Sequence, residues 1–116
     1  MYSNAMMGRL FLAVVCAAAI LPLGPASAQQ ATEVLVTYSN GQFQPSQISA
    51  PADKPIAIRV KNLDGKAMEF ESKSLRVEKV VAAKSDGVIS VRALKAGRYE
   101  FYDDFNEKAH GTLIVQ

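Results

Sequence analysis

The sequence predicts an all-β fold, a β-sandwich or barrel of about seven to eight strands. Short apolar segments rich in β-branched and aromatic residues recur at spacings of about eight to twelve residues. Clusters of Gly, Asn, Asp, Ser and Pro separate these segments, as expected of turns between strands. The segments lack convincing helical periodicity. Because the sequence contains no internal repeat or linker, it indicates one domain.

Three predicted strands lie in the first half of this domain. Residues 33–38 are apolar and β-branched and end at the turn pair Asn40-Gly41. Residues 43–51 form an extended segment that is restricted to an edge or irregular strand, because its two prolines donate no ladder hydrogen bonds. Residues 55–61 alternate apolar and polar side chains before a turn at 62–65.

The second half of the domain contains the remaining predicted strands. In residues 68–72 the side chains alternate, which places Glu69 and Glu71 on one face and Met68 and Phe70 on the other. The further strands are predicted at 75–81 and 88–94, separated by a turn at 84–87, and at 97–102 and 111–115.

The first 28 residues have the composition of a secretory signal peptide. A long apolar run follows Arg9, and Ala26-Ser27-Ala28 is an A-x-A cleavage signature. We therefore expect export and cleavage, which leaves a domain at 29–116. An uncleaved amino-terminal anchor is the alternative, although prolines end the apolar run short of the roughly 20 residues that a span needs. The start, 1–6, contains Ser-Asn-Ala, which resembles a scar of tag removal.

Composition argues against several classes of function for residues 29–116. They carry 12 Lys plus Arg (13 in the whole chain, less Arg9) and 11 Asp plus Glu, and this near-neutral balance argues against nucleic-acid binding. They contain one histidine and no cysteine, which excludes a disulfide and a thiolate ligand or nucleophile. The absence of a Ser-His-Asp order, a phosphate loop and a metalloprotease motif argues against hydrolytic catalysis.

Several segments together resemble the cupredoxin-like superfamily. Residues 43–48, 51–58 and Asn62 resemble its F-x-P-x-x-I, P-A-G-x-P-V and N signature. The G-x-Y-x-F-Y segment at 97–102 and the G-T-L-I-V segment at 111–115 agree with it. The resemblance covers nearly all of the predicted domain and implies a Greek-key β-sandwich.

The copper ligands of the superfamily are missing from this chain. A type-1 blue-copper site needs a thiolate and imidazoles with a weak axial sulfur. Asp103 stands where the cysteine of copper members falls, and Met68 stands at about the place of their first histidine. Ala109 occupies about the methionine position, and His110 follows one step later. The resemblance therefore implies the fold but no type-1 blue copper.

A narrower resemblance is to the cupredoxin-like domain of bacterial periplasmic EfeO-type and related small iron-transport proteins. It is carried by Glu69-Phe70-Glu71-Ser72, E-K-V-V at 78–81, the segment 94–101 and D-D-F at 103–105. It implies a periplasmic protein of ferrous-iron uptake that works with a membrane iron permease and another periplasmic iron-transport protein. It also implies carboxylate-rich binding of iron, copper or both, with at most an accessory role in Fe(II) oxidation. Such proteins often carry histidine after D-D-F, where this chain has Asn106.

The candidate metal ligands are the acidic residues of two segments and the one histidine. Glu69 and Glu71 lie two apart on one strand, so they share a face with their Cβ atoms about 6 to 7 Å apart. Asp103, Asp104, Glu107 and His110 are expected in the loop that closes the neighbouring strand. Oxygen ligands with at most one imidazole and one thioether suit Fe, Mn or Cu(II). The hypothesis is an open metal site that contains Glu69, Glu71, Asp103 and His110, with Met68 as a further ligand.

Each candidate also has a simpler interpretation. Glu69 and Glu71 can be the wet face of a strand, paired with Lys73, Arg76 or Lys79. Asp103-Asp104 can be a turn pair, His110 a surface residue and Met68 core filler. Glu78 either faces solvent or lies under the metal loop and orients a ligand. The alternative function is a metal-free interaction module of the periplasm that docks another protein through an edge of the sandwich.

Overall fold

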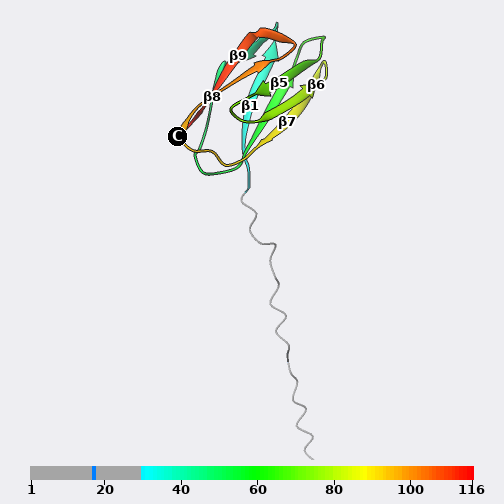
Figure 1. Cartoon of the computed structure of the whole chain (residues 1–116). Coiled ribbons are helices and arrows are strands. Elements are labelled where there is room, and N and C mark those ends of the chain that lie inside the picture. The colour runs from blue at the N-terminus through cyan, green and yellow to red at the C-terminus, as the bar shows by residue number, and fades with distance from the viewer. Residues whose placement is uncertain (1–16, 18–29) are drawn as a thin grey trace, which may run out of the picture.

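The computed structural model describes Ala17 and residues 30–116, so the predicted signal peptide, its cleavage site and the tag scar lie outside the described residues. Within the described part of the chain all regular structure is β, which confirms the predicted fold class. No helix among these residues is long and apolar enough to cross a membrane. Two sheets pack face to face as a sandwich (Figure 1).

Nine strands make up the two sheets. The four-stranded sheet has the order β2-β1-β4-β7, with bounds Gln42–Gln44, Thr32–Ser39, Ile56–Asn62 and Ser85–Val91. The five-stranded sheet has the order β3-β9-β8-β5-β6, with bounds Gln47–Ala50, Asn106–Val115, Gly97–Asp103, Met68–Ser72 and Val77–Val81. The pairs β1-β4 and β3-β9 are parallel, and the others are antiparallel.

The predicted turn at Asn40-Gly41 is confirmed. The pair Ser39 and Gln42 closes the β1-β2 hairpin, so only these two residues form the loop. Asn40 and Gly41 have φ angles of 53° and 67°, as a two-residue turn matching the twist of the strands requires. Asn and Gly tolerate this left-handed region better than other residues, which explains their use here.

The segment 43–51 forms edge strands, as its prolines predict, but it divides between the sheets. β2 is the edge of the four-stranded sheet, and β3 is the edge of the five-stranded sheet beside β9. Pro45 and Ser46 lie between the two strands, where no ladder hydrogen bond is interrupted. This division raises the strand count to nine, above the number that the sequence predicts.

The predicted bounds of three other strands are wrong. β6 begins at Val77 rather than residue 75, because residues 73–76 form a turn in which Leu75 is buried. β7 occupies Ser85–Val91 instead of 88–94, and β9 begins at Asn106 instead of residue 111. The predicted turn glycine, Gly87, lies within β7, where a Cβ would meet Val81 Cγ2 at 2.7 Å. Its role is therefore close packing of β7 against β6, which the sequence pattern does not distinguish from a turn.

The core lies between the sheets and is fully apolar at its centre. Phe43, Phe70 and Phe101 meet there, with ring centroids 4.9 Å apart for both Phe43–Phe101 and Phe70–Phe101. Gly111 admits the Phe101 ring, since a Cβ at this position would lie 2.2 Å from Phe101 Cε2. Met68 and Leu113 are also fully buried. The aromatic cluster joins β2, β5 and β8, and it therefore sets the positions of the strands that carry the acidic residues.

Candidate metal site

Alternation along β5 sends its two glutamates to the outer face of the five-stranded sheet. Met68 and Phe70 are buried in the core, whereas Glu69 and Glu71 are partly exposed, as the sequence predicts. Asp104 follows β8 in the turn to β9, and its backbone N–H donates to the Glu69 carbonyl at 2.9 Å. One carboxylate oxygen from each of Glu69, Glu71 and Asp104 lies within 4.8 Å of the others. We call these three residues the outer carboxylate cluster.

The strand register extends this cluster into a polar row across the outer face. Glu71 faces Glu78 of β6 on one side and Tyr102 of β8 on the other. Tyr102 in turn faces His110 of β9, and the two ring centroids are 6.1 Å apart. Residues directly opposite each other share one face of a sheet. Glu78 is exposed at the end of this row, so it faces solvent rather than lying beneath the site.

Negative charge accumulates on this face, and no ion pair within residues 30–116 balances it. Partial burial raises the pKa of Glu69, and the charges of Asp104, Glu78 and Glu71 raise it further. Burial also raises the pKa of Tyr102, followed by the charge of Glu71. Within residues 30–116 the side-chain ion pairs join Arg59 to Glu33 and Asp86, on the four-stranded sheet. The pairing of the glutamates with Lys73, Arg76 or Lys79 that the simpler interpretation expects is not formed.

Asp103 is separated from the outer cluster although it precedes Asp104 directly. Asp103 is only 2 % exposed, and its side chain points into the interior, toward the other sheet. Its Oδ2 accepts a hydrogen bond from the Tyr38 hydroxyl at 2.5 Å. Its Oδ1 accepts from the backbone N–H groups of Glu69 and Phe105, at 2.9 and 3.0 Å. Asp103 thus connects β1 of one sheet to β5 and β8 of the other.

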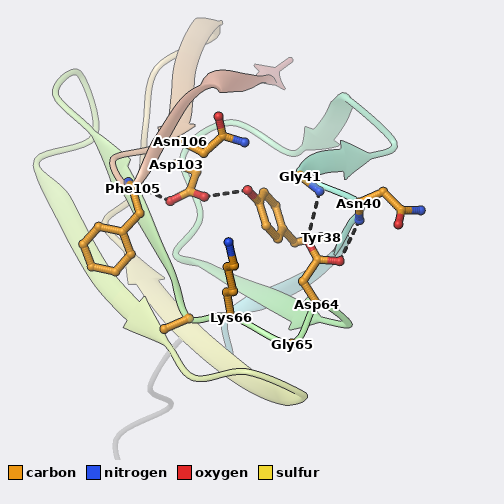
Figure 2. Close-up of a pocket in the computed structure, with 10 residues that line it drawn as sticks. Tyr38, Asn40, Gly41, Asp64, Gly65, Lys66, Asp103, Phe105 and Asn106 are labelled. Carbon is orange, nitrogen blue, oxygen red and sulfur yellow. Dashed lines mark hydrogen bonds between the residues drawn. The ribbon is translucent and has the colours of Figure 1, made fainter.

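A pocket of about 680 Å³ opens over the Tyr38–Asp103 pair (Figure 2). Asp64 lines one side, and its carboxylate accepts from the N–H groups of Asn40 and Gly41 at 2.7 and 2.9 Å. The buried side chain of Asn62 holds the same loop, donating to the Lys66 carbonyl at 2.8 Å and accepting from the Asp64 N–H at 3.0 Å.

The pocket also contains residues that the sequence interpretation does not assign to a site, namely Tyr38, Asp64 and Lys66. Phe105 and Asn106 complete its rim (Figure 2). In the sequence, Asn62 stands out only as part of the superfamily signature, and Asn106 only as a departure from a family pattern. Neither predicts a pocket without the strand pairing.

The expected loop at 103–110 is wrong, and this changes the candidate ligand set. Asp103 ends β8, Asp104 and Phe105 form the turn, and β9 begins directly after them. Glu107 and His110 are therefore strand residues, both exposed. Tyr102 stands between Glu71 and His110, so the backbone of His110 is two strands, or roughly 10 Å, from that of Glu71. Met68 faces the core, on the opposite side of β5 from Glu69.

The arrangement of the outer carboxylate cluster suits a metal cation chemically. Three carboxylates supply hard oxygen ligands. Mg, Ca, Mn and Fe ions bind such oxygen ligands, whereas softer ions prefer thiolates. The face is open to solvent, so water or a second molecule can fill the remaining coordination positions. Burial is the main cause of the raised pKa of Glu69, and a cation would also offset the repulsion from neighbouring carboxylates that raises this pKa further.

Comparison with known proteins identifies a matching family, a related sequence and solved structures of similar fold. A model of the cupredoxin-like domain matches residues 10–115. An uncharacterized protein of Rickettsia prowazekii (strain Madrid E) is 34 % identical over 84 residues, which cover 72 % of this chain and 67 % of that protein.

Similar solved structures include the metal-binding domain of the Cu(I)-exporting P-type ATPase of Streptococcus pneumoniae D39, crystallised with Cu(I). Its TM-score is 0.64 at 14 % identity, covering 77 % of this chain and 98 % of that domain. Auracyanin A, a blue copper protein of Chloroflexus aurantiacus, has a TM-score of 0.63 at 11 % identity, covering 75 % of this chain and all of that one (100 %). The structural likeness covers about three quarters of this chain and agrees with the family match over residues 10–115. The protein belongs to the cupredoxin-like domain family.

Proposed function

We propose that this protein binds a metal ion through Glu69, Glu71 and Asp104 on the outer face of the five-stranded sheet. The observation that carries the proposal is the convergence of three carboxylate oxygens within 4.8 Å of one another. No Lys or Arg within the described residues forms an ion pair with them. Like charges held this close favour either a proton or a metal cation between them. The proposed occupant is a divalent ion such as Fe(II), Mn(II) or Cu(II).

A blue-copper site does not fit the residues of this chain. Such a site requires a cysteine thiolate, and residues 30–116 contain none. Asp103 stands at the expected cysteine position, and its carboxylate already accepts three hydrogen bonds. Several proteins of this fold bind copper, which supports metal binding as a use of the fold. In this chain we assign that use to oxygen ligands on the outer face instead.

We further propose a role in the uptake of ferrous iron across the bacterial envelope. The E-F-E-S segment that resembles iron-transport proteins supplies two of the three proposed ligands, Glu69 and Glu71. A cleaved signal peptide would place the domain in the periplasm. There it would deliver iron to a membrane permease, together with a second periplasmic protein, or assist its oxidation. An exposed and weakly enclosed site suits delivery, because a partner can reach the ion directly.

Metal titration of the apoprotein tests the binding proposal. Calorimetry with Mn(II), with Cu(II), and with Fe(II) under anaerobic conditions should give one site tighter than about 0.1 mM, equivalent to roughly −5.5 kcal/mol. The double variant Glu69→Gln/Glu71→Gln should bind at least about tenfold more weakly, a loss of roughly 1.4 kcal/mol. The matched control, Glu33→Gln/Glu100→Gln, removes two glutamates elsewhere on the sandwich and should bind as the wild type does. Equal affinity in all three proteins contradicts the proposal.

Growth under iron limitation tests the proposed pathway. Deletion of the gene from its own host should impair iron-limited growth, and the wild-type gene should restore it. The Glu69→Gln/Glu71→Gln variant should fail to restore growth while it accumulates normally in the periplasm. If the variant binds metal poorly but restores normal growth, the assignment of the metal site stands and the proposed role in iron uptake is wrong.

One observation favours the alternative, a metal-free interaction module. Phe105 and Val80 are 58 % and 54 % exposed; Val80 faces Glu69 of the outer carboxylate cluster, and Phe105 follows Asp104 in the turn between β8 and β9. Exposed apolar side chains beside charges are common at protein interfaces. Under this alternative Phe105→Ser/Val80→Ser fails to restore growth, while Glu69→Gln/Glu71→Gln restores it fully.

A further inference from the structure

The two-residue turn between β1 and β2 is held by a single carboxylate. The backbone N–H groups of Asn40 and Gly41 donate to Asp64 at 2.7 and 2.9 Å, one to each carboxylate oxygen (Figure 2). These hydrogen bonds, that of Gly41 first, lower the pKa of Asp64, so the carboxylate is ionised at neutral pH. Asp64 therefore connects the turn to the β4-β5 loop, which is distant from it in sequence.

The β4-β5 loop holds Asp64 in position from its other side. The side chain of Asn62, a residue that is 1 % exposed, accepts from the Asp64 N–H at 3.0 Å. The Leu63 N–H donates to the Tyr38 carbonyl at 2.8 Å, which ties the loop to the end of β1. The ammonium group of Lys84 donates to the Leu63 carbonyl. The carboxylate is thus fixed against the turn by contacts that do not involve the turn itself.

Asn40-Gly41 is a sequence in which asparagine readily loses its side-chain amide. Asparagine is one of the thermolabile residues of proteins. A following glycine favours the reaction, because it has no Cβ to shield its backbone nitrogen from the asparagine side chain. Here Asn40 is exposed, and its carboxamide points away from the pocket (Figure 2). The local sequence therefore favours deamidation, whereas the two hydrogen bonds to Asp64 oppose it.

We propose that Asn40 is a modification site, where asparagine converts spontaneously to aspartate and isoaspartate, and that Asp64 restrains this reaction in the folded protein. The reaction requires the Gly41 nitrogen to lose its proton and attack the side-chain carbonyl of Asn40. Asp64 accepts a hydrogen bond through that proton, and its negative charge disfavours an anionic nitrogen beside it. The second hydrogen bond, from the Asn40 N–H, fixes the turn, so the reaction requires local opening.

The conversion consumes one water molecule and releases one ammonia. The Gly41 nitrogen gives its proton to solvent and forms a bond to Asn40 Cγ, while the Cγ–Nδ2 bond breaks and the leaving nitrogen takes up a proton. Water then adds to one of the two carbonyl carbons of the cyclic imide, and the bond from that carbon to the nitrogen breaks. Opening at Cγ gives aspartate, and opening at the main-chain carbonyl gives isoaspartate. Neither step involves an oxidant or a reductant.

Either product changes the rim of the pocket. Aspartate places a second carboxylate close to Asp64, where like charges repel each other. Isoaspartate adds a methylene group to the main chain of a hairpin loop that has only two residues. Gly41 lies close to Asn106, since a Cβ at position 41 would be 3.0 Å from Asn106 Nδ2. We therefore expect the modified turn to move the Asn106 side of the pocket.

Peptide mapping by mass spectrometry tests the proposal. The wild type, Asp64→Ala and Asp86→Ala are incubated at physiological temperature and slightly alkaline pH, and the peptide that contains residue 40 is quantified. Asp64→Ala should convert Asn40 at least about tenfold faster than the wild type, a change equivalent to roughly 1.4 kcal/mol. The matched control, Asp86→Ala, removes an exposed carboxylate of β7 and should convert at the wild-type rate. Alanine is used because asparagine at either position would create a new Asn-Gly pair with Gly65 or Gly87.

Two further samples separate the restraint by Asp64 from a general loosening of the fold. Val91→Ala removes buried methyl groups at the opposite end of the four-stranded sheet, and it should convert at the wild-type rate. In urea that unfolds the chain, the wild type and Asp64→Ala should convert equally fast, and both faster than the folded wild type. The comparison of folded and unfolded wild type does not depend on the folding of Asp64→Ala.

Four results overturn the proposal. Asp64→Ala can convert no faster than the wild type, or Val91→Ala can convert as fast as Asp64→Ala, which assigns the effect to general loosening. The folded wild type can convert as fast as the unfolded chain, which means that the fold does not restrain the reaction. Asn40 can also stay unchanged in every sample. Slow conversion in the folded wild type with fast conversion in Asp64→Ala and in the unfolded chain supports the proposal.

Discussion

Asp103 and Asp104 are neighbours in sequence, yet their carboxylates lie on opposite sides of the five-stranded sheet. Asp104 joins Glu69 and Glu71 outside, while Asp103 accepts three hydrogen bonds inside. The sequence hypothesis places both near one metal ion, because it expects Asp103 and Asp104 in the loop that closes the neighbouring strand. The turn is instead only two residues long, and the alternation of the strand continues to its last residue. At the scale of single residues, strand alternation therefore decides which acid can serve the outer site.

Replacement of Tyr38 by phenylalanine measures how much the hydrogen bond from Tyr38 to Asp103, which joins the two sheets, contributes to the stability of the fold. The variant removes the donor to Asp103 Oδ2 and leaves that oxygen without a hydrogen bond in a buried position. Hydrogen bonds to charged groups contribute about 1.5–3 kcal/mol, so we expect the free energy of unfolding to fall by about that amount. Urea denaturation measures it. Tyr99→Phe is the control, since it removes only an exposed bond to the Lys95 carbonyl and should cost less than about 1 kcal/mol.

The same tyrosine predicts how stability changes at high pH. Burial, followed by the hydrogen bond to Asp103, raises the pKa of Tyr38 to about 12. In the unfolded chain its pKa is about 10, so between about pH 10 and 12 the folded protein retains a proton that the unfolded chain loses. The free energy of unfolding must then fall as the pH rises through this range. In Tyr38→Phe the fall should be smaller, and an equal fall in both proteins would contradict the raised pKa.

Strand alternation made β5 predictable from sequence, whereas close packing made β7 unpredictable. The polar and apolar side chains of residues 68–72 alternate regularly, so both the strand and the faces of its glutamates follow from the pattern. The segment 84–87 reads as a turn because it contains Ser, Asp and Gly. Gly87 is required because Val81 approaches it from the other sheet, a contact between strands that local sequence does not encode. The pocket is not predictable from local sequence for the same reason, since its residues come from β1 and the turn after it, the β4-β5 loop and the β8-β9 hairpin.

At neutral pH the ionised Glu69 on the outer face of β5 should destabilise the folded protein. The raised pKa of Glu69 means that the folded protein binds its proton more tightly than the unfolded chain does. The ionised carboxylate therefore destabilises the fold above that pKa, and the effect disappears as the pH falls through the pKa. We expect Glu69→Gln to be more stable than the wild type at pH 7, with a difference that shrinks toward acidic pH. Urea denaturation at several pH values measures this.

Glu33 serves as the control, because it is paired with Arg59 and its replacement should not stabilise the protein. Glu33 accepts a hydrogen bond from Arg59 at 2.7 Å on the four-stranded sheet, so Glu33→Gln should be neutral or slightly destabilising. Saturating Mn(II) should abolish the advantage of Glu69→Gln by stabilising the wild type alone. A Glu69→Gln protein that is less stable than the wild type at pH 7 would show that the carboxylate makes a favourable interaction and is not strained by its neighbours.

At the scale of the whole molecule, the cupredoxin-like sandwich separates two chemically different acidic regions. The interior region joins the sheets through Tyr38 and Asp103, at the position where the resemblance to copper proteins places a cysteine. The exterior region collects Glu69, Glu71 and Asp104 on an open sheet face. The composition and the alternating pattern predict the fold class and the oxygen-rich chemistry. The separation of the two regions follows only from the register of β5, β8 and β9.

The position of a bound metal ion tests this account most directly. Crystals of the protein soaked in Mn(II) should give an anomalous difference peak between the carboxylates of Glu69, Glu71 and Asp104, and the peak should be absent from Glu69→Gln/Glu71→Gln crystals of the same form. A wild-type map with no peak at these carboxylates, or with its Mn(II) peak at His110 or Glu107 instead, would contradict the assignment of the metal site to the outer carboxylate cluster.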